Sequence, residues 1–266
     1  MKIISLVPSY TEILFSLGLD SELIGVTEHC DFPLEAQNIE KIGTFANPDP
    51  DKIIDLAPEL VCADPALHKQ AIAQLRDKGV KVFSPWLQSV KDVLQSMEDL
   101  ATLSRQQQAV LDVVNPLRER VGRVKEGASG KCRPRVFRVM SDSPVITPGP
   151  YSVQYDAIKL AGGTLMPMDD TAYQQVPWEE LIRFNPEILL FCGRSKADPK
   201  RPRCKGCLSK NPMCQREVDE IITEEWSGVN AVRNNKVYPL SCDVLCRPGV
   251  RLIAGIEKLN KYFQGV

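Results

Sequence analysis

The sequence predicts an α/β protein made of two lobes, each built on a parallel β-sheet, with one long and rigid helix joining them. Three observations carry this prediction. Short apolar segments alternate with amphipathic segments along the chain. A long helical pattern separates two sets of these segments, and both halves repeat one turn motif before a strand. Length does not decide the number of domains, because 266 residues permit one large domain or two smaller ones.

The first lobe is predicted over residues 1–103. Its strands are expected at residues 3–7, 23–26, 60–63 and 80–83, with helices between them. Ser9 and Glu12 have the spacing of a capping box, because a serine and a glutamate three residues apart can satisfy each other's backbone N–H groups. A helix is therefore expected to start there and to end near Gly18.

Residues 104–127 are predicted to link the lobes as one helix. Ser104 and Gln107 form a second capping box, and apolar side chains then recur at helical spacing as far as Glu126. About 23 residues at 1.5 Å each give a length of roughly 35 Å. Pro116 removes one backbone hydrogen bond and is expected to kink this helix. A helix inside one domain would show the same pattern, but its place between two strand sets favours a span between lobes.

The second lobe is predicted over residues 128–266. Its strands are expected at residues 135–140, 187–191 and 236–240, and a cysteine-rich insertion at residues 192–214. An internal repeat relates the two lobes: residues 55–61 and 183–189 both contain the end of a helix, a Pro-Glu turn and an apolar strand. The alternation of strands and helices makes each lobe Rossmann-like, and the repeat makes a duplication plausible.

Charge and motif content exclude several functions. The chain has 33 basic and 34 acidic residues and no basic stripe, so nucleic-acid binding is not expected. It contains no nucleophile–base pair, no phosphate-binding glycine loop and no Ser-His-Asp set. A ligand-binding protein is therefore favoured over an enzyme, although redox chemistry stays open.

The amino-terminal segment does not have the pattern of an export signal. A single lysine precedes the apolar stretch, Pro8 interrupts it, and no small-residue cleavage site follows. The chain as written is therefore expected in the cytoplasm, and in the periplasm or at the cell surface if a leader has been removed. Nine cysteines, an odd number, disfavour complete pairing in disulfides and favour metal binding for some of them.

A series of short motifs occurs in a fixed order over nearly the whole chain. The motifs are Ile4-Ser5-Leu6-Val7-Pro8-Ser9-Tyr10-Thr11-Glu12, Leu23-Ile24-Gly25-Val26, Cys30-Asp31-Phe32-Pro33, Lys41-Ile42-Gly43-Thr44, Leu56-Ala57-Pro58-Glu59-Leu60-Val61, Leu160-Ala161-Gly162-Gly163 and Trp178-Glu179-Glu180-Leu181. This series resembles the class III, helical-backbone periplasmic substrate-binding proteins for vitamin B12, iron siderophores and haem. The resemblance implies a small-molecule ligand held in a cleft between the lobes, at the carboxyl ends of the strands.

The resemblance also implies which residues contact the ligand. They are Pro8, Ser9, Tyr10, Glu28, His29, Cys30, Phe45 and Trp86 in the first lobe, and Tyr151, Asp243 and Arg247 in the second. Aromatic side chains suit a large planar metal chelate, such as a corrinoid (cobalamin) or an iron chelate. Two of these residues have alternative interpretations to contact with the ligand. Trp86 could belong to the core, and His29 could be a metal ligand or a hydrogen-bonded surface histidine.

Family members that dock on a membrane permease use an exposed acidic residue on each lobe. The equivalent region of the first lobe, residues 67–70, reads Leu-His-Lys-Gln and has no carboxylate. Docking on a permease is therefore doubtful for this chain.

Cys204, Cys207 and Cys214 form a Cys-x-x-Cys-x6-Cys pattern in the insertion, which directs two thiolates at one metal and offers a third. The further ligands are expected from Cys192, Cys242 and Cys246. Four thiolates suit an iron–sulfur cluster of the 4Fe-4S type or, alternatively, zinc. A redox pair or inert thiols also remain, and Cys62 and Cys132 are expected to be buried or incidental thiols.

Three functional hypotheses follow. The first is a receptor for a corrinoid or iron chelate, with a cysteine-ligated metal site near the ligand. The second is a cytoplasmic iron–sulfur redox enzyme that uses the same cleft. The third is an interaction protein that zinc stabilises through the cysteine-rich insertion.

Overall fold

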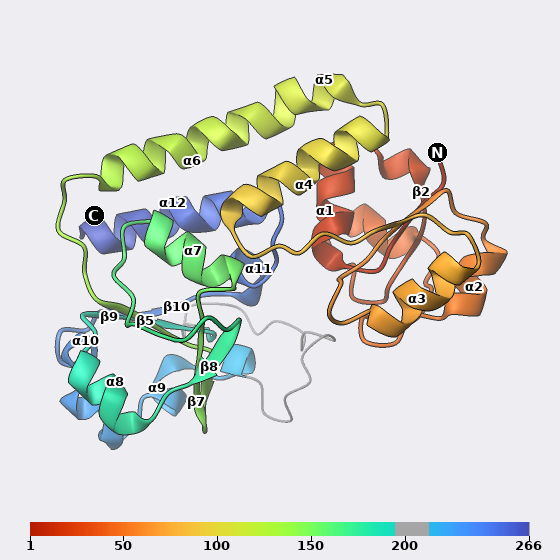
Figure 1. Ribbon diagram of the computed structural model, residues 1–266. Coiled ribbons are helices and arrows are strands. Elements are labelled where there is room, and N and C mark those ends of the chain that lie inside the picture. Colours follow the sequence, from red (N-terminus) through yellow and green to blue (C-terminus); the bar gives the residue numbers. More distant parts are fainter. Residues whose placement is uncertain (195–212, 266) are drawn as a thin grey trace. The chain divides into compact units, whose positions relative to one another are not determined.

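The computed structural model describes residues 1–194 and 213–265, without the side chain of Cys214. The chain forms two compact α/β units (Figure 1). Unit 1 contains Met1–Trp86 and Lys91–Arg118, and unit 2 contains Leu87–Val90 and the described residues from Glu119 onward. The boundary after Arg118 lies inside the segment 104–127 that was predicted as the link. None of the helices in the described ranges is long and apolar enough to span a bilayer.

Unit 1 is built on a four-stranded parallel sheet in the order β2-β1-β3-β4. The strands are β1 (Ile3–Ser5), β2 (Leu23–Val26), β3 (Leu60–Cys62) and β4 (Val82–Phe83). All four predicted strands are confirmed, apart from one or two residues at their ends. Every residue of β1 and β3 is buried, as expected for the central strands of a sheet that is covered on both faces.

Helix α1 (Pro8–Ser16) follows β1 directly, but the predicted capping box at its start is wrong. Pro8 is the first helical residue, and the capping residue Val7 has no side chain that could accept a hydrogen bond. Proline suits this position because its φ is already helical and the missing N–H would have no partner there. Ser9 therefore lies inside the helix, which ends before Gly18 at a φ of 71°, as predicted.

The other helices of unit 1 are short except for one. They are η1 (Asp20–Glu22), η2 (Leu34–Asn38), α2 (Pro50–Asp55), α3 (Lys69–Asp77) and α4 (Val90–Leu103). Helix α2 has a side-chain cap, because the Asp49 carboxylate accepts hydrogen bonds of 3.1 Å from the backbone N–H groups of Asp51 and Lys52.

The predicted linking helix is present, with a different start and an internal irregularity. It consists of α5 (Gln107–Ala109), the π-helical segment η3 (Val110–Val114) and α6 (Asn115–Ala128). The capping box at Ser104 is wrong, because the Ser104 hydroxyl donates back to the carbonyl of Leu100, at the end of α4. The π turn lies just before Pro116, whose ring would clash with the carbonyl four residues earlier in a regular helix.

Unit 2 is built on a three-stranded parallel sheet in the order β10-β9-β5, so the three predicted strands are confirmed. The strands are β5 (Val136–Val139), β9 (Ile188–Phe191) and β10 (Val237–Pro239). One face carries α7 (Val153–Leu160), α11 (Cys242–Leu245) and α12 (Arg251–Gln264); the other carries α8 (Trp178–Phe184), α9 (Val218–Ile221) and α10 (Asn230–Arg233) (Figure 1). The short helices η4 (Met213–Gln215) and η5 (Glu224–Gly228) complete the described part of this unit.

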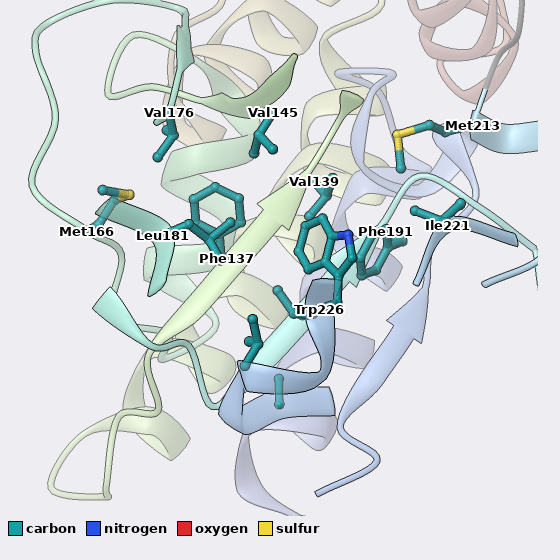
Figure 2. Close-up of a cluster of buried hydrophobic side chains, with 13 residues drawn as sticks. Phe137, Val139, Val145, Met166, Val176, Leu181, Phe191, Met213, Ile221 and Trp226 are labelled. Atoms are coloured by element: carbon teal, nitrogen blue, oxygen red, sulfur yellow. The ribbon is translucent and has the colours of Figure 1, made fainter. Parts of the chain in front are cut away.

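A cluster of buried apolar side chains fills the second of these faces (Figure 2). Alternate strand residues enter it, among them Phe137 and Val139 from β5 and Phe191 from β9. Trp226 of η5 packs edge-on against Phe191, with 5.6 Å between the ring centroids. Because residues of a strand point alternately to the two faces, the residue between Phe137 and Val139 points to the face that carries α7 and α11.

A second sheet in unit 2 was not predicted. It is antiparallel and consists of β6 (Ser141–Asp142), β7 (Val145–Pro148) and β8 (Tyr173–Gln175). A two-residue strand and a partner about 25 residues away leave no periodic pattern long enough to indicate a strand.

The internal repeat is visible in the backbone. Ala57 and Asn185, which precede the two Pro-Glu turns, have φ values of 47° and 45°. Both residues therefore end their helices in the left-handed conformation, which L-residues other than asparagine rarely adopt. The same unfavourable conformation at the same point of both halves supports the predicted duplication.

The glutamates of the two turns make the same contact. The Glu59 carboxylate accepts a hydrogen bond of 2.7 Å from the backbone N–H of Lys2, and the Glu187 carboxylate accepts one of 2.9 Å from that of Arg135. Lys2 and Arg135 each stand directly before the first strand of their unit, β1 or β5. The two turns therefore attach the start of the first strand in the same way.

Candidate functional site

Three predicted ligand residues of unit 1 follow the carboxyl end of β1, at the start of α1. Pro8, Ser9 and Tyr10 are all buried. The Ser9 hydroxyl and the Tyr10 hydroxyl have no hydrogen-bond partner among the residues that the structure describes. Burial, together with nearby Cys62 and Asp64, raises the pKa of Tyr10, so this phenol stays neutral and can donate a hydrogen bond.

His29, in the loop after β2, has a defined tautomer. Its Nδ1 accepts a hydrogen bond of 2.9 Å from the backbone N–H of Phe45, so in the neutral ring Nε2 carries the proton. Nε2 is buried and without a partner in the described ranges. Because Nδ1 is occupied and Nε2 is protonated, His29 is arranged as a donor and not as a metal ligand. The alternative of a surface histidine is also wrong, since only 8% of this residue is exposed.

His68 was not predicted as a site residue, yet it supports the same loop. Its Nδ1 accepts from the backbone N–H of Asp64 at 3.0 Å, which leaves Nε2 to donate to the carbonyl of Phe45 at 2.7 Å. Desolvation lowers the pKa of His68 and favours this neutral form. The Phe45 ring lies between the two histidines, with centroid distances of 5.9 Å to His29 and 5.6 Å to His68. No sequence signal marks His68 beyond the scarcity of histidine.

Cys30 and Glu28 differ in exposure. Cys30 is 1% exposed, and its Sγ lies 3.0 Å from the hydroxyl of Thr11 and 3.4 Å from that of Thr27. Burial raises the pKa of Cys30, so it is a neutral thiol inside unit 1. Glu28 is exposed, and only its backbone is fixed, by a hydrogen bond to the carbonyl of Gly43.

Two predicted aromatic residues are exposed in their own units. Trp86, which follows β4, is 63% exposed, so the alternative that it belongs to the core is wrong. Tyr151 precedes α7 and is 47% exposed. The carboxylate of Asp170 raises the pKa of Tyr151, which keeps this phenol protonated. Both rings are available for stacking on a planar ligand.

Asp243 and Arg247 lie at and after α11. The Asp243 carboxylate accepts from the Ser241 hydroxyl at 2.7 Å and forms an ion pair of 3.4 Å with Arg251. This carboxylate is therefore held by its own neighbours, and Arg247 is half-buried.

The predicted metal ligands are only partly described. Cys204 and Cys207 lie outside the described residues, as does the side chain of Cys214. Cys192 follows β9 and packs against the cluster of Figure 2. Cys242 is the first residue of α11, and Cys246 directly follows this helix, one turn after Cys242. Within the described parts of the chain, no three Cys, His, Asp or Glu side chains lie close enough together to hold a metal ion. The described residues therefore give the iron–sulfur prediction no support.

The two ends of the cysteine-rich insertion meet beside β9. Arg194 forms a parallel bridge and an ion pair of 2.5 Å with Glu217. Arg216 forms a second ion pair, 2.6 Å from Asp142 of β6. The described residues on either side of this segment therefore lie next to each other in unit 2.

Arg138 of β5 is a buried charged residue that the sequence analysis missed. It is completely buried; its Nε donates to the side-chain oxygen of Gln154 at 2.6 Å, and its Nη2 donates to Sγ of Cys246 at 3.2 Å. Nη1 is buried and has no partner among the described side chains. A lone arginine inside an apolar strand was the signal that could have revealed it.

Residues 3–243 match the model of the family described as periplasmic binding protein. The chain belongs to the periplasmic binding protein family. A Bacillus subtilis relative, described as the uncharacterized ABC transporter substrate-binding lipoprotein YvrC, is 28% identical to this periplasmic binding protein over 97% of the chain and 78% of its own length. The vitamin B12-binding protein of Vibrio parahaemolyticus is 27% identical over 100% of the chain and 90% of its own length.

The fold agrees with a solved structure. The crystal structure of the periplasmic vitamin B12 binding protein BtuF of Vibrio cholerae matches with a TM-score of 0.80 at 23% identity, and covers 99% of this chain and 96% of that one. The predicted fold class of two α/β units with parallel sheets is thereby confirmed. Membership of this family makes the chain a binding protein and not an enzyme, so the redox-enzyme hypothesis is set aside.

Proposed function

We propose that this periplasmic binding protein is the receptor for a corrinoid-type metal chelate, with cobalamin as the first candidate. The observation that carries the proposal is the similarity to vitamin B12-binding proteins along the whole chain, without a missing lobe. An iron chelate, such as a siderophore or haem, is the second candidate, because it shares the large planar or macrocyclic shape that exposed aromatic rings suit.

The described side chains supply the two kinds of contact that such a ligand needs. Trp86 and Tyr151 offer exposed ring faces for apolar contact with a macrocycle. Ser9, Tyr10 and His29 offer buried polar hydrogens without partners in the described ranges, which suit acceptor groups at the rim of a ligand. These donors would discriminate among ligands, since an unpaired buried donor costs about 1–3 kcal/mol.

The location that fits this function is the periplasm or the cell surface. The family and the lipoprotein relative favour this alternative over the cytoplasmic expectation. A transporter partner is part of the same proposal, because the relative is named as a component of an ABC transporter. The segment 67–70, which lacks a carboxylate, keeps permease docking doubtful as a separate prediction.

Calorimetric titration of the purified protein with cyanocobalamin, hemin and a ferric siderophore tests the ligand class. One saturable site for cyanocobalamin is expected, with weaker binding of the other two. Trp86→Ala should weaken cobalamin binding about tenfold through lost ring contact. Tyr173→Ala is the matched control, because Tyr173 is a 55% exposed aromatic residue on β8 that the proposal does not use. Absence of binding to all three ligands would reject the proposal.

We further propose that the cysteines of the insertion at residues 192–214, together with Cys242 and Cys246, hold a metal centre, with a 4Fe-4S cluster preferred and zinc as the alternative. The support is the Cys-x-x-Cys-x6-Cys spacing together with Cys192 at the point where the insertion begins. Anaerobic purification followed by iron, sulfide and zinc analysis tests this proposal. Iron and sulfide in equal amounts are expected; protein that contains neither iron nor zinc would reject it.

A further inference from the structure

Both histidines of the chain bind the main chain of one residue, Phe45. Nδ1 of His29 accepts from the Phe45 N–H at 2.9 Å, and Nε2 of His68 donates to the Phe45 carbonyl at 2.7 Å. The Phe45 ring also lies between the two imidazole rings. Because only two of 266 residues are histidines, their meeting at one residue indicates that the position of Phe45 is controlled.

Phe45 depends on the histidines because its own turn does not pair its peptide groups. The turn at residues 44–47 is closed by the Thr44 N–H, which donates to the Asn47 carbonyl at 3.2 Å, and by the Asn47 N–H, which donates to the Thr44 hydroxyl at 3.1 Å. Among the residues that the structure describes, no main-chain group bonds to the N–H or the carbonyl of Phe45. The two imidazoles therefore supply the partners that these peptide groups need.

The ring of His68 is fixed by the turn that starts at Asp64. His68 is 1% exposed, and its Nδ1 accepts from the Asp64 N–H at 3.0 Å. The Asp64 carboxylate accepts from the N–H groups of Ala66 at 2.9 Å and Leu67 at 2.8 Å, which makes the turn rigid. The position of Nε2, and with it the contact to Phe45, therefore depends on an unprotonated Nδ1.

We propose that His68 is a positioning residue for the ligand, and that its protonation in acid weakens ligand binding. A proton on Nδ1 would face the Asp64 N–H, so two donors would meet and the ring would have to turn away. Nε2 would then leave the Phe45 carbonyl. The Phe45 N–H orients His29 as a donor, so this inference rests on the proposed function, in which His29 contacts the ligand.

The direction of the pH effect follows from the environment of His68. Desolvation lowers the pKa of His68, and the hydrogen bond to Phe45 and the Asp64 carboxylate only partly oppose this effect. The pKa in the folded protein therefore lies below the ordinary histidine value of about 6.5. The contacts are complete above that ordinary value, and they are lost as the pH falls through the lowered pKa.

The other titratable groups near His68 are exposed, paired or held by the contacts above. They are Lys69, Arg76 and Asp77 of α3, Asp51, Lys52 and Asp55 of α2, which packs against α3, Tyr10 of α1, and His29 across the Phe45 ring. Lys52 pairs with Glu40, and Tyr10 stays a neutral phenol. Strand β4, which also packs against α3, has no titratable side chain. Asp64 is therefore the charged side chain that acts on His68.

Calorimetric titration with cyanocobalamin at about pH 7.5 and about pH 5.5 tests the inference. Wild type should bind about tenfold more weakly at the lower pH. His68→Gln keeps a donor for the Phe45 carbonyl but takes up no proton in this range, so its affinity should be nearly the same at both pH values. Gln74→Ala changes an exposed residue of α3 and, as the matched control, should keep the wild-type pH dependence. An equal pH dependence in wild type and His68→Gln would overturn the inference.

Asp64→Asn tests the sign of the effect. The asparagine oxygen can still accept from the N–H groups of Ala66 and Leu67, but the carboxylate that raises the pKa of His68 is removed. The midpoint of the loss in affinity should therefore move to a lower pH. A midpoint that stays in place or moves to a higher pH would overturn the assignment to His68.

Hydrogen exchange of the ligand-free wild type separates this inference from the proposed function. The N–H groups of Asp64 and Phe45 donate to imidazole nitrogens, so their protection factors should fall between about pH 7.5 and about pH 5.5. The N–H of Val61, which donates to the carbonyl of Lys81, should keep its protection as the control. Unchanged protection of Asp64 would overturn the inference, whether or not cobalamin binds. Absence of cobalamin binding at both pH values would reject the proposed function and the role of His68 in it, while a loss of protection would still support the pH-sensitive contact.

Discussion

The first strands of the two units carry side chains of different charge at the same position. Counted from Lys2 and Arg135, Ser5 of β1 and Arg138 of β5 occupy the same position. Ser5 lies in a neutral network, where its Oγ is 2.9 Å from the Thr11 hydroxyl, and that hydroxyl is 3.0 Å from Sγ of Cys30. Arg138 instead contacts a thiol directly, as a cation. The two units therefore place a cysteine near this strand with different neighbours: Cys30 contacts the hydroxyl of Thr11, whereas Cys246 contacts the guanidinium of Arg138.

The difference indicates what sets the state of a cysteine in this fold. Burial raises the pKa of Cys30, and its hydroxyl neighbours only partly oppose that effect. At Cys246 the neighbour is the buried guanidinium of Arg138, 3.2 Å from Sγ. A cation beside a thiol favours the thiolate, so we expect Cys246 to be the charged cysteine of the two. The strand position is shared, so the two cysteines differ in whether a hydroxyl group or a guanidinium contacts their sulfur.

The largest expected effect is that of an arginine introduced into unit 1 at the position that corresponds to Arg138. Ser5→Arg would bury a guanidinium among neutral partners in unit 1, and should destabilise the protein by about 3–5 kcal/mol. Urea unfolding followed by circular dichroism measures this loss. Ser5→Ala is the control and should cost about 1 kcal/mol. If Ser5→Arg lowered the free energy of unfolding less than Ser5→Ala, unit 1 would tolerate a buried cation at this position as unit 2 does.

Removal of the two cysteines should also have unequal effects. Cys246→Ala removes the sulfur that accepts from the buried guanidinium of Arg138 and should cost about 3 kcal/mol. Cys30→Ala removes only weak hydrogen bonds and should cost roughly 1 kcal/mol. Denaturant unfolding of both variants, and of Arg138→Met combined with Cys246→Ala, tests the pair. The double variant should recover most of the loss; additive losses would mean that no charge pair exists.

The glutamates of the two Pro-Glu turns should contribute unequally to the stability of the protein. Glu187 is 39% exposed and Glu59 is 63% exposed, and both accept a backbone N–H before their strand. Glu187→Ala is expected to cost about 1 kcal/mol, and Glu59→Ala a few tenths, because water competes more for the exposed carboxylate. Thermal unfolding of both variants checks the order, and the reverse order would contradict it.

The smallest effect concerns the left-handed residues of the repeat. Ala57→Gly should stabilise the protein by roughly 0.5 kcal/mol, because glycine adopts a positive φ without strain. Asn185→Gly should change the stability by only a few tenths, since asparagine already tolerates this conformation. Equal effects in thermal unfolding would argue against the strain assigned to Ala57.

The sequence allowed the seven parallel strands to be predicted, because continuous apolar segments between turn residues mark buried strands. Helix starts were less predictable. Ser9 and Ser104 both have capping-box spacing, but Pro8 begins one helix earlier, and Ser104 bonds back into the helix before it. Local spacing alone does not determine which of several adjacent residues ends a helix.

The places of Tyr10, His29 and Trp86 after strand ends could be predicted from the sequence, whereas their contact with a ligand stays a prediction. Arg138 and His68 were missed because their roles depend on partners 108 and 23 residues away, Cys246 and Phe45. No spacing within a single segment reveals such contacts. The tautomer of His29, which excludes it as a metal ligand, likewise depends on a backbone N–H supplied by another loop.

The thiolate absorption in the ultraviolet of metal-free protein near neutral pH tests the central claim most directly. The difference spectrum between wild type and Cys246→Asp should contain the absorption of one thiolate, and the difference between wild type and Cys30→Ala should contain none. Retention of the full thiolate absorption in Cys246→Asp, or its loss in Cys30→Ala, would contradict the claim that Arg138 makes the cysteine of unit 2 the charged one.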